Sequence, residues 1–202
     1  MGEPGWSALA AAITDERPQV RAGAAYGLWQ AREETTIPVL LEALNDSERY
    51  VRGYAALALG EFGEPSVIEP VAALADDPDA EVRVCAATTL GREDDDRAGP
   101  LFRAALAKNG DAARLAAALI GRHQIEMGVD PLIEALGNES AELRAACAVA
   151  LGQVGDPRAL PALDLAAEDP ATGAAAEAAR EIRALSEPWP EVLPLDDDWE
   201  PR

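Results

Sequence analysis

The feature that most constrains this chain is a pattern that recurs about every 31 residues. An arginine preceded by an apolar residue and followed within a few positions by alanines returns at steps of 30 or 31, at Arg21, Arg52, Arg83, Arg114 and Arg144. A sixth copy is degraded, with Ala175 in the place of the arginine. A period of this length indicates stacked helical or mixed units, each of which buries its apolar face against its neighbours.

Three further markers keep the same period. Six residues before each arginine position stand Asp15, Asp46, Asp77, Lys108, Asn138 and Asp169, so Lys108 departs from the pattern. Glycines recur at Gly60, Gly91, Gly121 and Gly152, and prolines at Pro38, Pro70, Pro100, Pro131 and Pro161. Proline is tolerated in the first turn of a helix, and glycine commonly ends one in a left-handed conformation. Each unit is therefore expected to hold two helices, one opened by the proline and the other ended by the glycine.

The composition supports helices packed through small side chains. The chain is 49% hydrophobic but only 4% aromatic, and Val51, Ala55 and Leu59 recur at helical spacing. We predict an all-α, right-handed superhelix of about six helix pairs, a curved rod of the armadillo type. It spans residues 1–186, with units near residues 5–33, 34–63, 64–93, 94–124, 125–155 and 156–186. Residues 187–202 form an acidic tail with prolines and two tryptophans, which either caps the last unit or reaches a partner.

The repeated residues resemble the HEAT-repeat superfamily, in the short form found in phycobilisome lyases. The resemblance rests on the Asp-x5-Arg spacing, the valine before the arginine and the Ala-Ala-x-x-Leu-Gly that follows, and it covers nearly the whole chain. It implies a structural ladder of charge-assisted hydrogen bonds between aspartate and arginine along the inter-helix turns. Its expected pairs are Asp15 with Arg21, Asp46 with Arg52, Asp77 with Arg83, and Asn138 with Arg144.

The charge balance restricts the class of partner. The chain holds 37 acidic residues against 17 basic ones, for a formal net charge of -20. Such a surface repels phosphate backbones and anionic lipid, so we expect neither nucleic acid nor a membrane as a partner. A protein or peptide with basic character would be attracted. The start of the chain has no signal-peptide pattern, and its two cysteines belong to separated units, so we expect a cytoplasmic protein with reduced thiols.

Few residues could carry chemistry. His123 is the only histidine, and Cys85 has no histidine in any matching register to activate it. The acidic run from Glu93 to Asp96 lacks the glycine and the spacing of a calcium loop, and it suits the opening of a helix. We therefore expect no catalytic residue, no cofactor and no metal site.

The aromatic residues gather in the first two units and suggest a binding surface. Tyr50 and Tyr54 lie one turn apart and share a helix face. In the repeat register this face also carries Glu81, Cys85 and Glu142, and we predict that these five residues bind protein. Trp6 and Trp29 are expected to cap the end of the solenoid, because terminal repeats need a cover.

Three functions remain open on the sequence. The first is a non-enzymatic scaffold that holds a protein or peptide on a concave acidic surface. The second, suggested by the resemblance, is a bilin lyase subunit or a chaperone of a chromophore-bearing protein. The third is an acidic inhibitor or immunity-type protein that blocks a cationic partner by charge mimicry. Neither the partner's identity nor the oligomeric state follows from the sequence.

Overall fold

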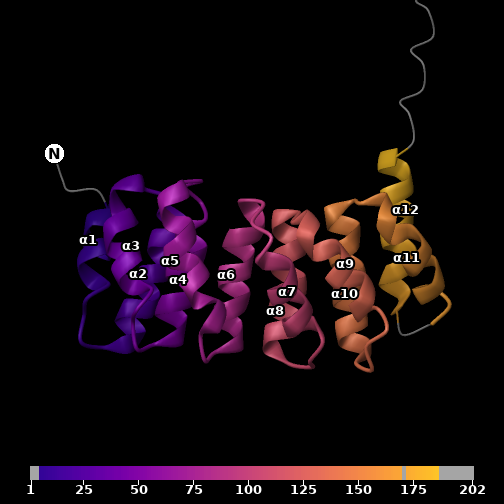
Figure 1. The fold of residues 1–202 in the computed structure, drawn as a ribbon, viewed down its shortest axis with the longest axis horizontal. Helices are drawn as coiled ribbons and strands as arrows, with labels where there is room; N and C mark the ends of the chain where they lie inside the picture. Colours follow the sequence, from indigo (N-terminus) through magenta and orange to yellow (C-terminus); the bar gives the residue numbers. More distant parts are fainter. Residues whose placement is uncertain (1–4, 170–171, 187–202) are drawn as a thin grey trace, which may run out of the picture.

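The chain folds into a rod of antiparallel helix pairs. The computed structural model describes residues 5–169 and 172–186, and over these residues it contains twelve α-helices and no β-strand. The helices follow one another along the long axis, from α1 at one end to α12 at the other (Figure 1). The predicted all-α solenoid of about six helix pairs is therefore confirmed.

The helices alternate between two layers. The first helices of the pairs have five to nine residues and are α1 (Gly5–Ala12), α3 (Ile37–Ala43), α5 (Ile68–Ala72), α7 (Ala98–Leu106), α9 (Val129–Ala135) and α11 (Leu160–Ala166). The second helices have eleven to fourteen residues and are α2 (Pro18–Ala31), α4 (Arg49–Leu59), α6 (Ala80–Arg92), α8 (Asp111–His123), α10 (Ala141–Val154) and α12 (Gly173–Ser186). Each repeated proline lies in the first turn of a first helix, as predicted.

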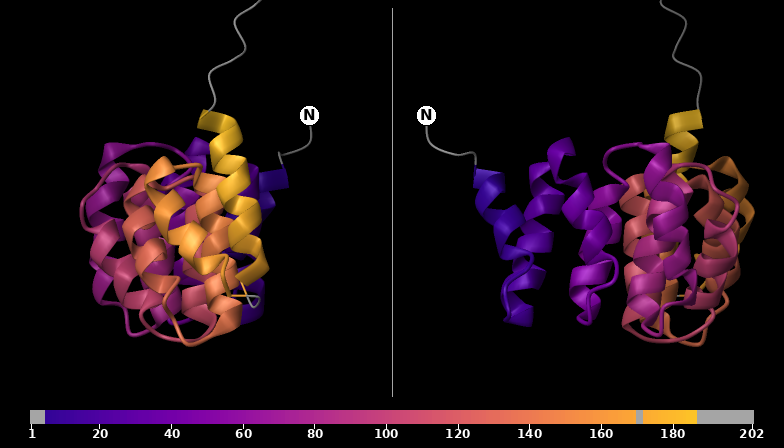
Figure 2. Two further views of the ribbon diagram at one scale, coloured as in Figure 1. Left: turned by 90° about the vertical axis from the view of Figure 1, so that its right-hand side faces the viewer. Right: turned by 60° about the vertical axis from the view of Figure 1, so that its left-hand side comes forward.

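The second helices form the more closely packed layer. Contacts run without interruption from α2 to α12 through each successive even-numbered helix, whereas in the described ranges the only appreciable contact between odd-numbered helices is the smaller one of α7 with α9. Small side chains at one register position allow this approach, and they are all buried: Ala24, Ala55, Ala86, Ala117 and Cys147. A solenoid curves toward its closer layer, so the even-numbered helices line the concave side. Figure 2 shows the rod from one end and in an oblique view.

The repeated glycines serve packing, and the prediction that they end the second helices in a left-handed conformation was wrong. Gly60 has a right-handed φ of -66°. A Cβ there would lie 2.6 Å from Thr89 Oγ1 of the next unit, so the glycine is needed for close helix approach. The left-handed residues come about three positions later, and they keep the repeat period at Arg32, Gly63, Asp94, Gln124 and Gly155.

An arginine-to-aspartate ladder ties consecutive units together. Arg52 donates from Nε and Nη2 to the two carboxylate oxygens of Asp77 in the next unit, at 2.7 and 2.9 Å. Arg21 makes the same two-pronged contact with Asp46, at 2.6 and 2.9 Å. Arg144 reaches Asp169 at 2.7 Å. Bidentate guanidinium–carboxylate pairs of this kind fix orientation as well as adding energy.

The sequence predicted that each arginine pairs with the aspartate of its own unit. That prediction was wrong, because the carboxylate partner belongs to the next unit. Arg52 contacts its own unit's Asp46 only through the main-chain carbonyl, at 2.8 Å. The same holds for Arg21 with Asp15, Arg83 with Asp77, and Arg144 with Asn138. The reason is the turn itself: the carboxylate of Asp46 accepts the main-chain N–H of Glu48 at 2.8 Å and faces the preceding unit.

The ladder is interrupted where α6 meets α8. The position that should offer Arg83 a carboxylate is Lys108, and Arg83 makes no ion pair within the described residues. Arg114, one unit on, pairs instead with Asp111 in its own helix. The interface between the third and fourth units therefore lacks the arginine–aspartate pair that joins α2 to α4 and α4 to α6.

Replacing Lys108 with aspartate should supply the missing rung. The new carboxylate would face Arg83 and raise the free energy of unfolding by about 0.5–1 kcal/mol, a modest gain because position 108 is exposed. Urea unfolding of wild type, Lys108→Asp and Lys108→Asn measures the effect, with the asparagine variant as a control for loss of the cation. Equal stability of the two variants would show that Arg83 finds no partner there.

The ion pair between Arg52 and Asp77 should make the free energy of unfolding depend on pH in a defined way. Burial raises the pKa of the Asp77 carboxyl, but hydrogen bonds from Arg52 and from the main chain of Asp79 lower it more, so the net pKa lies below the usual 3.8. The stabilisation is thus present above pH 3.8 and is lost as the pH falls through the folded-state pKa.

Asp77→Asn should consequently cost about 1–3 kcal/mol at pH 7 and progressively less below pH 4. Denaturant unfolding at a series of pH values measures the difference from wild type. Asp96→Asn, at an exposed position, controls for the change in net charge. A penalty for Asp77→Asn that stays constant down to pH 3 would contradict the assignment.

Candidate protein-binding groove

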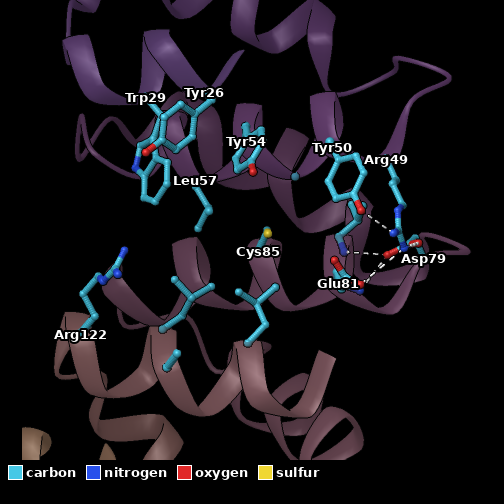
Figure 3. Close-up of a pocket in the computed structure, with 15 residues that line it drawn as sticks. Tyr26, Trp29, Arg49, Tyr50, Tyr54, Leu57, Asp79, Glu81, Cys85 and Arg122 are labelled. Carbon is cyan, nitrogen blue, oxygen red and sulfur yellow. Dashed lines mark hydrogen bonds and ion pairs between the residues drawn. The ribbon is translucent and has the colours of Figure 1, made fainter. Parts of the chain in front are cut away.

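An apolar pocket opens on the layer of even-numbered helices. It has a volume of about 260 Å³ and lies between α2 and α4 on one side and α8 on the other, with α6 at its floor (Figure 3). We call it the aromatic pocket. Its principal lining residues are Tyr26, Trp29, Tyr50, Gly53, Tyr54, Leu57, Cys85, Leu115, Leu119 and Arg122.

Three aromatic rings in mutual contact form one wall of the aromatic pocket. The centroid of the Tyr26 ring lies 5.9 Å from that of Trp29 and 5.3 Å from that of Tyr54, both edge to face. Trp29 and Tyr54 are 6.3 Å apart and nearly parallel. Such contacts hold the rings in place, so the wall is formed before any partner arrives. Tyr26 is nevertheless 47% exposed.

The N-terminal ends of α4 and α6 form the acidic end of the aromatic pocket. Arg49 donates to Asp79 at 3.0 Å and to Tyr50 Oη at 2.6 Å, and its guanidinium lies 4.6 Å above the Tyr50 ring. It also approaches Glu81 at 3.4 Å. Two carboxylates thus share one guanidinium. Burial raises the pKa of Asp79, but the Arg49 hydrogen bond and main-chain donors outweigh it and keep that carboxyl ionised.

A buried carboxylate near the C-terminal ends of the second helices supports the opposite end of the aromatic pocket through its contact with Trp29. The Glu61 side chain is only 3% exposed and accepts from Arg92 at 2.7 Å, from Trp29 Nε1 at 3.3 Å, and pairs with Arg32 at 3.0 Å. Burial raises its pKa, but these donors lower it more and the net shift is downward. Glu61 thereby fixes the Trp29 ring in the wall of the aromatic pocket.

His123 lies close to this cluster but has no catalytic arrangement. Its buried Nε2 makes no hydrogen bond within the described residues. Burial, and then the positive charge of Arg92, lower the pKa of the imidazole, so it is neutral at pH 7. Cys85 is 6% exposed, and burial raises its pKa to about 12, which disfavours the thiolate. No group of three or more potential metal ligands occurs among the described residues.

Four of the five residues predicted to bind protein line this one pocket. Tyr50, Tyr54, Glu81 and Cys85 are brought together there, although Cys85 contributes little surface. Glu142, at the start of α10, is exposed but does not line it. Glu142 occupies the same register position on α10 as the pocket residues do on α4 and α6. It does not lie beside them, because α10 is two second helices beyond α6 along the rod.

The sequence interpretation missed several lining residues. Trp29, expected to cap the solenoid, instead lies in the aromatic wall, while Trp6 packs partly buried against the core at the first helix. The sequence could have pointed to Tyr26 and Trp29. Gly23 is the register counterpart of Tyr54, and the two aromatic residues follow Gly23 by about one and two helical turns, so they lie on the same side of their helix. Leu115, Leu119 and Arg122 carried no such signal, since leucine is common on every helix here.

The comparisons with known proteins identify the family. A family model of HEAT repeats matches residues 7–70, 37–120 and 108–183. The chain therefore belongs to the HEAT-repeat family. A comparison of the sequence with curated proteins gives no significant match.

Solved structures show the same architecture. An engineered protein is similar with a TM-score of 0.54 and 16% identity, covering 90% of this chain and 100% of its own. The YibA protein of Escherichia coli has a TM-score of 0.52 and 21% identity, with 90% and 82% covered. The complex of CpcE and CpcF of phycocyanin lyase from Nostoc sp. PCC7120 has a TM-score of 0.51 and 17% identity, with 90% and 96% covered. At these identities the likeness shows the fold alone.

None of the helices in the described ranges combines the length and the apolar character that crossing a bilayer requires.

Proposed function

We propose that this protein is a non-enzymatic scaffold that holds a segment of a partner protein across α2, α4, α6 and α8. The observation that carries the proposal is the aromatic pocket, where Tyr26 and Tyr50 are 47% and 44% exposed beside a preformed apolar hollow. Rigid, partly exposed tyrosine and tryptophan next to a pocket are the residues that dominate binding energy at protein interfaces.

The dimensions suit one large side chain of an extended segment. The volume of about 260 Å³ is smaller than the usual small-molecule site. A second hollow lies on the other side of the same tyrosines, between Pro18 of α2 and Glu48. The two hollows share Tyr26, Tyr50 and Tyr54. A chain segment could thus run through the groove with its anchor in the aromatic pocket.

We propose further that the partner is basic overall. The net charge of -20 attracts a cationic protein and speeds its encounter with this surface. Close to the pocket, Asp79 and Glu81 together carry one more negative charge than Arg49 neutralises. The unpaired thiols of Cys85 and Cys147 suit the reducing cytoplasm, which we propose as the compartment.

Selection from a random library of 12-residue peptides displayed on phage tests the proposal. Wild type should enrich peptides that combine a large apolar residue with net positive charge. Those peptides should bind the Tyr50→Ala/Tyr54→Ala double variant at least about tenfold more weakly, because truncation of an aromatic anchor removes much of the binding energy. Fluorescence anisotropy with the synthetic peptides gives the dissociation constants.

A matched control is Leu165→Ala/Leu185→Ala, which removes two exposed apolar side chains from α11 and α12, outside the groove. It should bind the selected peptides like wild type. Selected peptides that bind the tyrosine double variant undiminished, with that variant folded by circular dichroism, would show that the groove is not the binding surface. Enrichment of acidic peptides would contradict the proposed basic partner.

A further inference from the structure

Arg122 is exceptional among the arginines of this acidic chain. Within the described residues only Arg83, Arg122 and Arg180 lack an ion pair with a carboxylate. Arg83 and Arg180 each donate to a main-chain carbonyl, whereas no hydrogen bond of Arg122 occurs in the described ranges. Its side chain extends from α8 into the aromatic pocket, on the side that Trp29 and Leu57 form (Figure 3).

The surroundings of Arg122 are positively charged. Arg32 and Arg92 both pair with the one buried carboxylate of Glu61, at 3.0 and 2.7 Å. Burial and then the charges of Arg92, Arg122 and Arg32 lower the pKa of His123, whereas the charge of Glu61 raises it, so the three guanidiniums and this carboxylate all lie near that imidazole. Arg122 is exposed at the edge of the aromatic pocket, so its charge can attract an anion that lies against the apolar wall.

The two ends of the aromatic pocket consequently carry opposite charge. At the N-terminal ends of α4 and α6, Asp79 and Glu81 share the one guanidinium of Arg49. At the C-terminal end of α8, Arg122 makes no ion pair with any residue that the structure describes. Between these ends the lining is apolar, from Tyr54 and Leu57 across to Leu115. A complementary segment would carry charges in the reverse order on either side of an apolar anchor.

Resting on the proposed function, we infer that the partner segment places a large apolar side chain in the aromatic pocket and a neighbouring acidic side chain on Arg122. Its basic residues then lie toward Asp79 and Glu81. The adjoining hollow beyond Tyr26 and Tyr50 continues the surface on the side away from Arg122, so the basic part of the segment can extend past the pocket there. Arg122 can form a charge-assisted pair with the carboxylate while the apolar wall excludes water around it.

Arg122 also stands in the last turn of α8, where a positive charge favours the helix dipole. That role would affect stability alone. A ligand-binding role, in contrast, discriminates between an anionic and a neutral ligand of the same shape. The test therefore uses two probes that differ in charge and share their aromatic body.

The probes are 1-anilinonaphthalene-8-sulfonate, whose aromatic body carries one anionic group in place of the carboxylate, and the neutral N-phenyl-1-naphthylamine. Fluorescence titration gives the affinity of each for wild type, Arg122→Gln and Arg114→Gln. Arg114 is an exposed arginine two turns earlier on α8 that does not line the aromatic pocket, so it is the matched control. Thermal melts show that the variants are folded.

We expect Arg122→Gln to weaken binding of the anionic probe about five- to tenfold and to leave the neutral probe unchanged. Arg114→Gln should change neither. Equal affinity of wild type and Arg122→Gln for the anionic probe would overturn the assignment of Arg122, as would a parallel loss of both probes. The peptide selection tests the proposed scaffold function separately, because its result depends on how the Tyr50→Ala/Tyr54→Ala double variant binds the selected peptides.

Discussion

Close packing between successive second helices is the constraint on which the rest of this structure depends. Ala55 and Ala86 are completely buried at equivalent positions, and the Cβ that Gly60 lacks would collide with Thr89 of the next unit. Small side chains let these helices approach, while the first helices stay further apart, so the layer of even-numbered helices becomes concave. On the even-numbered helices, bulky aromatic side chains then have room where this layer faces outward. That is where Tyr26 and Tyr54 meet, and where the aromatic pocket forms.

The polar connections between units follow the same geometry. Arg21, Arg52 and Arg144 each hold their own turn by a main-chain carbonyl and the next turn by a carboxylate, so one side chain sets the spacing of two units. The series is interrupted at Lys108 and resumes at Arg144, and the aromatic pocket spans the interrupted seam, with α4 and α6 before it and α8 after it. The groove thus has a rigid wall on α2 and α4 and an opposite wall on α8. In the described residues α8 is joined to α6 by packing, with no arginine–aspartate pair between them.

The repeat period predicted the helix pairs, the layer of small residues and the prolines in first turns, because each of these depends on position within one unit. It did not predict what passes between units. Arg52 was paired with Asp46, and the structure pairs it with Asp77, because the turn directs each carboxylate backward along the rod. Trp29 was assigned to the end of the solenoid, and Glu61 of the next unit holds it in the pocket. The helical spacing of Tyr50 and Tyr54 predicted that they share one surface, and both line the aromatic pocket, whereas Arg122 stands out only by its lack of a partner among the described residues.

The central claim, that partner segments bind in the groove over α2, α4 and α8, is tested most directly by the indole N–H resonances of the tryptophans in a ¹⁵N-labelled protein titrated with a selected peptide. Trp29 lies in the aromatic wall and donates to Glu61, whereas Trp6 packs against the core on α1 and serves as an internal reference. The account predicts that the Trp29 indole resonance and the amides of Leu115 to Arg122 shift together while Trp6 stays in place. Shifts confined to the odd-numbered helices, with Trp29 unmoved, would contradict it.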